Sequence, residues 1–347
     1  MITTMHVVFF LIGLALIFDV FNSFHDAANS VATVVTTRVL SPVQAVFWAS
    51  FFNFVAAFVF GTGVAKTISD KLVDPKVVDL YVIFGGLIGA IIWDIITWLM
   101  ALPTSSSHAI ISGYAGAAIA KSGFSSLLLK GWVPVLVFLV VSPIIGMILA
   151  YIFMVIVSWI SFKTERHKAE KTFSHLQLVS AGAYSLMHGT NDAQKTMGII
   201  AALLVSTGKK EWTVGHFHAL GGKSELAMWI ILSCHTAMAI GTMLGGWRIV
   251  KTVGSRITPH LQPMGGFSAE LAAATTIGLA TFAAVPISTT HAIGGAVASV
   301  GATRGWHAVR CGFGASGSFT LGFSRFLERL LSVRPVIGSR TMDWSLL

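Results

Sequence analysis

Two short stretches of this chain repeat one pattern: residues 22–29 read Asn-Ser-Phe-His-Asp-Ala-Ala-Asn, and residues 188–195 read His-Gly-Thr-Asn-Asp-Ala-Gln-Lys. Each stretch places an aspartate, Asp26 or Asp192, between apolar segments. Where such segments cross a bilayer, a central carboxylate costs roughly 2.5–3.5 kcal/mol on insertion scales, so chance rarely keeps one at two matched positions. The repeated aspartate therefore predicts a chain of two homologous halves.

A second repeated motif follows the first in each half. Residues 103–108 read Pro-Thr-Ser-Ser-Ser-His and residues 286–291 read Pro-Ile-Ser-Thr-Thr-His, with the proline and the histidine five positions apart both times. The motif aspartate and this histidine are 82 residues apart in the first half and 99 in the second. The additional residues of the second half fit the largely polar stretch 208–225.

The composition is that of an integral membrane protein. Of the 347 residues, 54% are hydrophobic and 11% are charged, whereas soluble domains carry roughly 25% charged residues. This excludes a soluble enzyme, a nucleic-acid-binding protein and a disordered protein. The net charge of +9 comes from basic residues between apolar runs, where they act as orientation signals. The two cysteines, Cys234 and Cys311, provide neither a disulfide framework nor a CxxC metal site.

Apolar runs define the candidate membrane segments, which lie at 5–24, 43–65, 81–102, 132–160, 176–187, 226–247 and 267–284. Shorter segments rich in Gly, Ala, Ser and Thr lie at 28–40, 109–120, 197–207 and 292–301. At ~1.5 Å per residue these cannot cross a hydrocarbon core of ~30 Å alone, so we expect half-helices or re-entrant segments. Broken backbone at membrane depth is tolerated only where it is buried in protein or lines a cavity.

The order of these segments predicts the architecture. Five elements precede the basic stretch 162–175 when 5–40 is counted as one broken helix, and an odd number means that the second half enters the membrane from the opposite side. The expected fold is an all-α polytopic membrane protein whose two halves form an inverted-topology repeat with broken or re-entrant helices, as in many secondary transporters. The expected divisions are a first transmembrane repeat at 1–161, a basic cytoplasmic linker at 162–175, a second transmembrane repeat at 176–310 and an atypical tail at 311–347.

The first motif pair supplies candidate cation ligands. Asp26 and Asp192 either bind a cation or proton or cap the N-terminus of a half-helix, and the two roles are compatible. Asn22, Asn29 and Asn191 add amide donors and neutral oxygens nearby. Oxygen-rich clusters of this kind suit hard cations or protons rather than soft metals.

Other acidic residues lie in apolar surroundings. Glu270, in the apolar run 267–284, is a further candidate for cation or proton coupling. Asp94, between Trp93 and Trp98, is a similar case, and Asp19 is interpreted as part of the first broken helix.

The second motif pair predicts an anion site. Each proline is followed by hydroxyl residues and a Gly- and Ala-rich segment, which is a helix-start signature. The free backbone N–H groups and the positive dipole end of such helices attract anions, and two facing ends would form a cradle with hydroxyl donors. Ordinary N-capping is the alternative role. The candidate anion-binding residues of this motif pair are Ser105, Ser106, Ser107, Ser288, Thr289 and Thr290.

Basic side chains in both motifs have alternative roles. His108 and His291 are candidates for a proton relay or for hydrogen-bond donors to the anion, because histidine titrates near neutrality, or they are hydrogen-bonded inside the bundle. Lys195 either neutralises an anion or extends to the membrane interface.

Serine with histidine is also typical of an intramembrane hydrolase, but hydrolysis needs one nucleophile and one base, whereas this chain contains the arrangement twice. We therefore expect no enzyme.

At these motifs the sequence resembles the PiT family of inorganic phosphate transporters, over about residues 18–310. The resemblance is carried by residues 22–45, 102–108, 188–195 and 285–291. It implies low-affinity phosphate uptake by cation symport in an inverted-repeat fold. It also implies cation and phosphate binding at the positions of Asp26, Asp192, Ser105 and Ser288, and a role for Glu270.

The resemblance bears on the coupling ion and the partners. Sodium-coupled members carry a glutamate where this chain has Asn53, which favours the proton-coupled bacterial branch and its neutral metal–phosphate substrate. Sodium coupling, another oxyanion such as sulfate, and a channel are the alternatives. We expect a plasma (bacterial inner) membrane protein with phosphate and the lipid bilayer as partners, no cofactor or structural metal, and a homodimer as an option.

The C-terminal stretch departs from the family pattern. Family members end in a span equivalent to 132–160, but residues 311–324 are too short and too rich in Gly and Ser for one, and several charged residues follow. We expect either a shifted reading frame or truncated allele, or a basic amphipathic helix at the interface.

Overall fold

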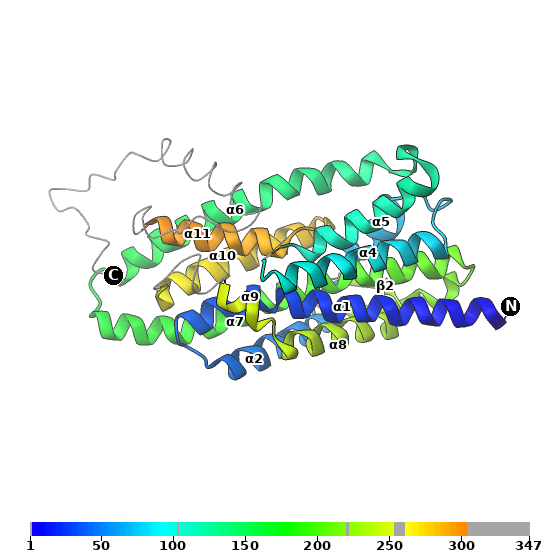
Figure 1. Ribbon diagram of the computed structural model, residues 1–347. Helices are drawn as coiled ribbons and strands as arrows, with labels where there is room; N and C mark the ends of the chain where they lie inside the picture. Colours follow the sequence, from blue (N-terminus) through cyan, green and yellow to red (C-terminus); the bar gives the residue numbers. More distant parts are fainter. Residues whose placement is uncertain (1, 103, 220–221, 253–260, 304–347) are drawn as a thin grey trace.

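A computed structural model describes residues 2–102, 104–219, 222–252 and 261–303, which form an elongated bundle of helices (Figure 1). The first half of the chain contains α1 (Ile2–Thr36), α2 (Pro42–Val55), η1 (Ala56–Phe58), α3 (Gly63–Lys71), α4 (Leu80–Leu99), α5 (Ser106–Ser122), η2 (Phe124–Ser126) and α6 (Leu129–Ser161). The second half contains α7 (Arg166–Ser206), η3 (Lys210–Trp212), β1 (Val214–Ala219), β2 (Gly222–Leu226), α8 (Met228–Leu244), α9 (Trp247–Thr252), α10 (Pro263–Phe282) and α11 (Thr289–Thr303).

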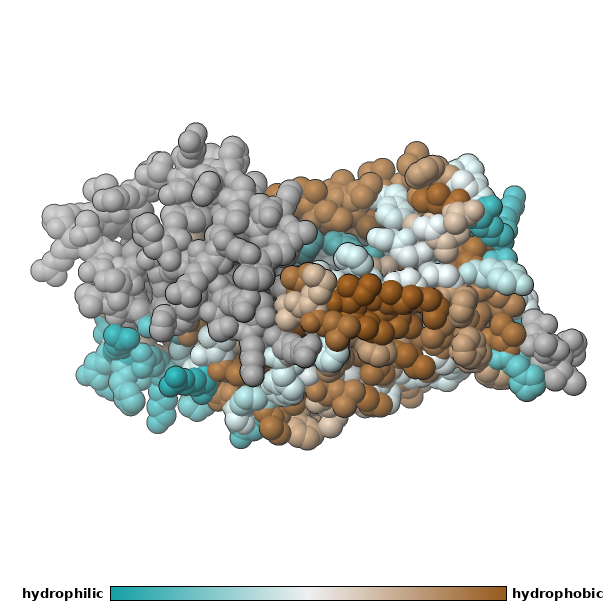
Figure 2. All heavy atoms as spheres, in the orientation of Figure 1, coloured by the Kyte–Doolittle hydropathy of each residue, from teal (hydrophilic) through white to brown (hydrophobic). Residues whose placement is uncertain are grey.

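The bundle has the surface of a membrane protein. Within the described residues, three helices are long and apolar enough to cross a bilayer, and a fourth span results if the bent pair 42–58 and 63–71 is counted as one. Figure 2 shows apolar side chains along the flanks of the coloured surface and hydrophilic side chains toward its ends. The expected all-helical membrane architecture is confirmed, with one small addition: β1 and β2 pair as an antiparallel hairpin inside the stretch predicted to be a polar loop.

α1 and α7 are unbroken at the two aspartates, and here the sequence prediction was wrong. Asp26 lies inside α1 and Asp192 inside α7, so neither caps a half-helix, and the segments 28–40 and 197–207 largely continue these two helices. Their low hydropathy reflects contact with other helices rather than a break. Small and hydroxyl side chains let neighbouring backbones approach closely, so such residues line helix interfaces inside membrane proteins.

α1 and α7 run antiparallel. Thr196 Oγ1 donates to Asp19 Oδ1 at 2.9 Å near one end of the contact, and Thr37 Oγ1 donates to Gln177 Oε1 at 2.9 Å near the other. Residue numbers therefore rise along α1 while they fall along α7. Because α7 begins at Arg166, the expected linker 162–175 is mostly the first turns of this helix.

The chain breaks instead between η1 and α3, where the axis bends by 75°. The sequence predicted a single membrane element over 43–65. The side chain of Gln194 in α7 satisfies the freed backbone groups: its Oε1 accepts from the Val64 N–H at 2.8 Å and its Nε2 donates to the Gly61 carbonyl at 2.9 Å. A helix start inside the bundle needs such a partner, because water is not available there.

The two short helices α5 and α11 begin in the same way. Two residues beyond the end of α4 and of α10 lies an alanine in the left-handed region, Ala101 (φ 53°) and Ala284 (φ 57°). The next amide bonds back to the carbonyl five residues earlier at 2.9 Å in both cases, Leu102 to Thr97 and Val285 to Ala280. The predicted helix starts at the two Pro-Ser/Thr motifs are confirmed; Pro103 lies outside the described residues.

α6, the last helix of the first half, packs on α11 of the second half. Ser299 Oγ of α11 donates to the Met147 carbonyl at 2.8 Å, and glycines on both helices allow the close approach. A Cβ at Gly146 would lie 2.6 Å from the Ala292 carbonyl oxygen. The predictions for residues 304–310 and for the tail 311–347 fall outside the described residues.

Candidate functional site

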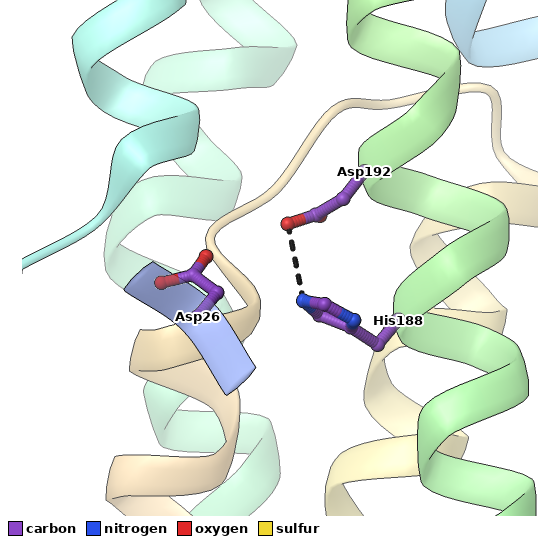
Figure 3. A group of neighbouring side chains, drawn as sticks. All are labelled: Asp26, His188 and Asp192. Atoms are coloured by element: carbon purple, nitrogen blue, oxygen red, sulfur yellow. Dashed lines mark ion pairs between the residues drawn. The ribbon is translucent and has the colours of Figure 1, made fainter. Parts of the chain in front are cut away.

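Asp26 of α1 meets His188 and Asp192 of α7 in the interior of the bundle (Figure 3). Each residue offers a ligand atom, and the three atoms lie within 4.8 Å of one another. His188 Nε2 lies 3.4 Å from Asp192 Oδ2. All three side chains are buried, with at most 2% of their surface exposed. The two aspartates that the repeat singled out therefore face each other, because α1 and α7 cross at these positions.

The first turn of α11 contacts both aspartates. Thr289 Oγ1 donates to Asp192 Oδ2 at 3.3 Å, and Thr290 Oγ1 donates to Asp26 Oδ1 at 3.4 Å. Asn29, one turn beyond Asp26, donates to Thr290 Oγ1 at 2.8 Å. The two repeated motifs thus form one site, in which the Pro-Ser/Thr motif of the second half contacts the Asp motifs of both halves.

Lys195 brings α5 into the same site. Its ammonium donates to Asp192 Oδ1 at 2.5 Å and to the Ser107 hydroxyl of α5. Only 1% of the lysine is exposed, so it does not extend to the membrane interface. A cationic group and the N-terminus of α5 therefore lie beside the carboxylates.

The serines just after the prolines cap their own helices. Ser105 Oγ accepts from the His108 N–H at 3.3 Å, and Ser288 Oγ accepts from the His291 N–H at 3.2 Å. The capping role that the sequence left open is therefore realised at both positions. The first turns of α5 and α11 lie at the site through Ser107, Thr289 and Thr290, and the positive dipole end of a helix favours negative charge nearby.

The two motif histidines also come together. The rings of His108 and His291, from α5 and α11, are in edge contact with centroids 5.0 Å apart. Each is partly buried, unlike the buried group around Asp26. The second motifs of the two halves therefore face each other as the first motifs do.

Three candidates lie apart from this centre or serve to position it. Glu270 accepts from Gln177 Nε2 at 3.0 Å and from Ser180 Oγ at 2.5 Å, near the N-terminal end of α7. Asn191 donates to Thr281 Oγ1 at 2.9 Å and accepts from the Ile287 N–H at 3.4 Å, so its amide holds the segment that precedes α11. Asn22 is buried, and its Oδ1 has no hydrogen-bond partner among the described residues.

His188 is a site residue to which the sequence reasoning gave no role. Its Nδ1 lies 3.3 Å from Asn53 Oδ1, and Asn53 Nδ2 donates to Thr242 Oγ1 of α8 at 2.8 Å. The signal was available, since His188 lies four residues before Asp192 and therefore on the same helix face. It also opens the repeated motif, at the position of Asn22 in the first half.

The arrangement combines cation-binding and anion-binding chemistry. Asp26 Oδ2 has no hydrogen-bond partner among the described residues, and the Asp26 carboxylate lies beside His188 and Asp192, so a cation bound by this group would also be available to the unpaired oxygen. Carboxylate oxygens bind hard cations, and an imidazole nitrogen adds a ligand for a transition metal. The lysine and the helix N-termini, directly beside it, attract an oxyanion.

Comparison with known proteins identifies the family. A sequence model described as the phosphate transporter family matches residues 22–316. The chain belongs to this family. It is an integral membrane transporter and not an enzyme, as the sequence predicted.

Two bacterial relatives are similar to this phosphate transporter family member over most of its length. A "Probable low-affinity inorganic phosphate transporter" of Rhizobium meliloti is 50% identical over 302 residues, which cover 87% of both chains. The protein of the same name from Bacillus subtilis is 44% identical over 292 residues, or 84% of both chains. A solved structure named "The sodium-dependent phosphate transporter" matches with a TM-score of 0.76 and 23% identity, covering 94% of this chain and 99% of that one. At that identity the likeness shows the fold alone.

Proposed function

We propose that this member of the phosphate transporter family imports inorganic phosphate by symport with protons, with the phosphate entering as a complex with a divalent metal. The family membership carries the phosphate assignment. The single structural observation that carries the mechanism is the buried contact of Asp26, His188 and Asp192 beside Lys195 and the starts of α5 and α11.

Phosphate binds, in this proposal, between the N-termini of α5 and α11, near Lys195 and Asn29. The proposed phosphate ligands with hydroxyl groups come from the two second motifs: Ser105, Ser106, Ser107, Ser288, Thr289 and Thr290. Asp26 and Asp192 bind the driving cation, with Asn22 close by. Glu270 of α10 takes part in cation coupling at a second position, where it contacts Gln177 and Ser180 of α7. Opposite charges in one buried cavity lower each other's burial cost, which couples cation and phosphate binding.

The two halves form an inverted-topology repeat, and two observations support this. α1 and α7, which carry the equivalent aspartates, run antiparallel, as the contacts Asp19–Thr196 and Thr37–Gln177 require. The turns that precede α5 and α11 have the same left-handed alanine and the same hydrogen bond. A repeat of this kind supports alternating access by movement of one repeat against the other around a central site.

Protons are favoured over sodium because of Asn53. This residue is neutral, whereas sodium-coupled members of the PiT family, which the sequence resembles, carry a glutamate at its position. Asn53 also contacts His188 of the central site. An amide at this position adds no negative charge to hold a sodium ion. His108 and His291 stay candidates for a proton relay.

Radiolabelled phosphate uptake into proteoliposomes tests the proposal. We expect accumulation driven by an imposed pH gradient, increased by Mg²⁺, with sodium unnecessary. Accumulation that requires a sodium gradient would overturn the proton assignment alone. Stronger competition by sulfate than by unlabelled phosphate would overturn the substrate, and conductance without accumulation would indicate a channel.

The variants Asp26→Asn and Asp192→Asn test the site. Each removes one buried carboxylate with little change in shape, and we expect both to lose gradient-driven uptake while the protein still inserts in the membrane. Asp70→Asn, at an exposed position near the end of α3, is the matched control and should behave as the wild type. Uptake at the wild-type level in both site variants would contradict the assignment.

A further inference from the structure

Asp94 is a buried carboxylate that the proposed mechanism does not use. It lies in α4, a helix long and apolar enough to span a membrane, and only 2% of its surface is exposed. Neither carboxylate oxygen has a hydrogen-bond partner of normal geometry among the described residues. A buried charge is stable only when it is paired, so this group requires a proton or a bound cation.

The surroundings of Asp94 are polar and lead to the central site. His25 of α1 and the Ser106 hydroxyl of α5 lie within interaction range of its carboxylate. His25 Nδ1 lies 3.4 Å from Asp26 Oδ1, and its Nε2 lies 3.2 Å from Thr97 Oγ1, three residues after Asp94. The Ser106 hydroxyl is also buried without a hydrogen-bond partner in the described part of the chain. Two unpartnered polar groups on adjacent helices therefore lie beside Asp26.

The charges around the two motif aspartates are unequal. In the second half Lys195 pairs with Asp192, whereas the equivalent position of the first half is the neutral Asn29. Conversely, when the two halves are aligned at their motif histidines and at their left-handed alanines, the position equivalent to Asp94 is the apolar Ile277. One half thus neutralises its aspartate with a lysine, and the other adds a second carboxylate.

We propose that Asp94, with the hydroxyls of Ser106 and Thr97, forms a second cation-binding site next to Asp26 and holds a further monovalent cation, H⁺ or Na⁺, in addition to the cation at Asp26 and Asp192. The inference rests on the proposed symport. Asp192 has a lysine, Lys195, as its cationic partner, whereas Asp26 and Asp94 share the imidazole of His25, whose Nδ1 lies 3.4 Å from Asp26 Oδ1. The first half therefore holds the larger excess of negative charge and attracts the added cation. Carboxylate and hydroxyl oxygens are the ligands that a small hard cation prefers.

The test separates coupling from phosphate binding. Purified Asp94→Asn is compared in proteoliposomes with the exposed-site control Asp70→Asn. One assay measures phosphate accumulation driven by a pH gradient or by a sodium gradient. The other measures phosphate counterflow without any cation gradient. We expect Asp94→Asn to lower accumulation roughly tenfold more than it lowers counterflow, within the range of coupling free energies between sites. Asp94→Glu, which keeps the charge, should restore part of the accumulation. The gradient that drives the wild type identifies the cation.

Two outcomes would overturn the Asp94 site. One is accumulation by Asp94→Asn equal to that of Asp70→Asn; the other is an equal loss of accumulation and counterflow in a variant that elutes as a monodisperse protein in detergent. Absence of both activities from the wild type would instead overturn the proposed phosphate symport, so the two failures are distinguishable.

Discussion

At the scale of single residues, the site depends on charges that are buried together. Lys195 and Asp192 are 1% and 0% exposed, and their side chains lie three positions apart on α7. An ion pair removed from water is stable only if both members are present, because either charge alone keeps the full desolvation penalty. The lysine therefore stabilises the fold by neutralising Asp192, and it does so at the position where the proposed mechanism binds an anion.

This pairing predicts a non-additive pair of substitutions. Lys195→Met alone should lower the free energy of unfolding by about 3–5 kcal/mol, because it leaves Asp192 buried without its cation. The double variant Asp192→Asn with Lys195→Met should recover much of that loss, since both charges are gone, yet show no gradient-driven uptake. Unfolding in detergent measures the first effect and proteoliposome uptake the second.

Lys168→Met is the control for the loss of a lysine. That side chain is 70% exposed and pairs with Glu165, so its removal should change stability little. A double variant no more stable than Lys195→Met would show that the ion pair is not the source of the destabilisation.

At the scale of helices, close backbone contact decides where the site residues lie. α4 and α5 pack through two glycines, where a Cβ at Gly113 would lie 2.6 Å from the Gly86 carbonyl oxygen. α5 carries Ser106 and Ser107 at its start, so this contact positions one wall of the site. Glycine is required there because any side chain would separate the two helices.

The variant Gly113→Val tests this contact. We expect a loss of about 1–3 kcal/mol in unfolding free energy from overpacking, and reduced phosphate uptake from displacement of the start of α5. Gly116→Val on the same helix is the matched control, because a Cβ there has no neighbour within 4 Å. Unfolding in detergent compares the two, and equal stability of both variants would contradict the packing argument.

At the scale of the whole molecule, the described interior is rich in negative charge. The buried acidic residues are Asp19, Asp26, Asp94, Asp192 and Glu270, and the described residues include one buried lysine, Lys195. Such an excess inside a membrane protein is compensated by protons or bound cations. In the proposed mechanism a cation and phosphate bind close together in this interior, so each should increase the affinity for the other.

This linkage predicts how ligands change thermal stability. Phosphate should raise the Tm of the purified protein, since a ligand that binds only the folded state stabilises it. The apparent Kd for phosphate, obtained from the Tm shift, should fall by roughly 5–150-fold when the coupling cation is supplied. The comparison uses sodium against choline, each at pH 6 and pH 8, with sulfate as the anion control. Identical phosphate affinity in all four conditions would exclude linkage between the two ligands.

The sequence alone determined the membrane class, the family, the repeated motifs and the starts of α5 and α11. These follow from local signals, because hydropathy, proline and hydroxyl residues act over a few positions. Sequence reasoning misplaced the break in the chain. Gly, Ala, Ser and Thr lower the hydropathy of 28–40 and 197–207, but in a folded bundle they line helix contacts and the helices continue.

Only the tertiary structure decided which polar groups meet. His188 joins the two aspartates because α1 and α7 cross there, Lys195 turns inward to Ser107, and Glu270 is held by Gln177 and Ser180 at a distance from the centre. Only the tertiary structure likewise shows that the carboxylate of Asp94 lies beside Ser106 without a hydrogen-bond partner among the described residues. Contacts between helices far apart in the chain depend on packing and crossing geometry, which no local pattern of residues encodes.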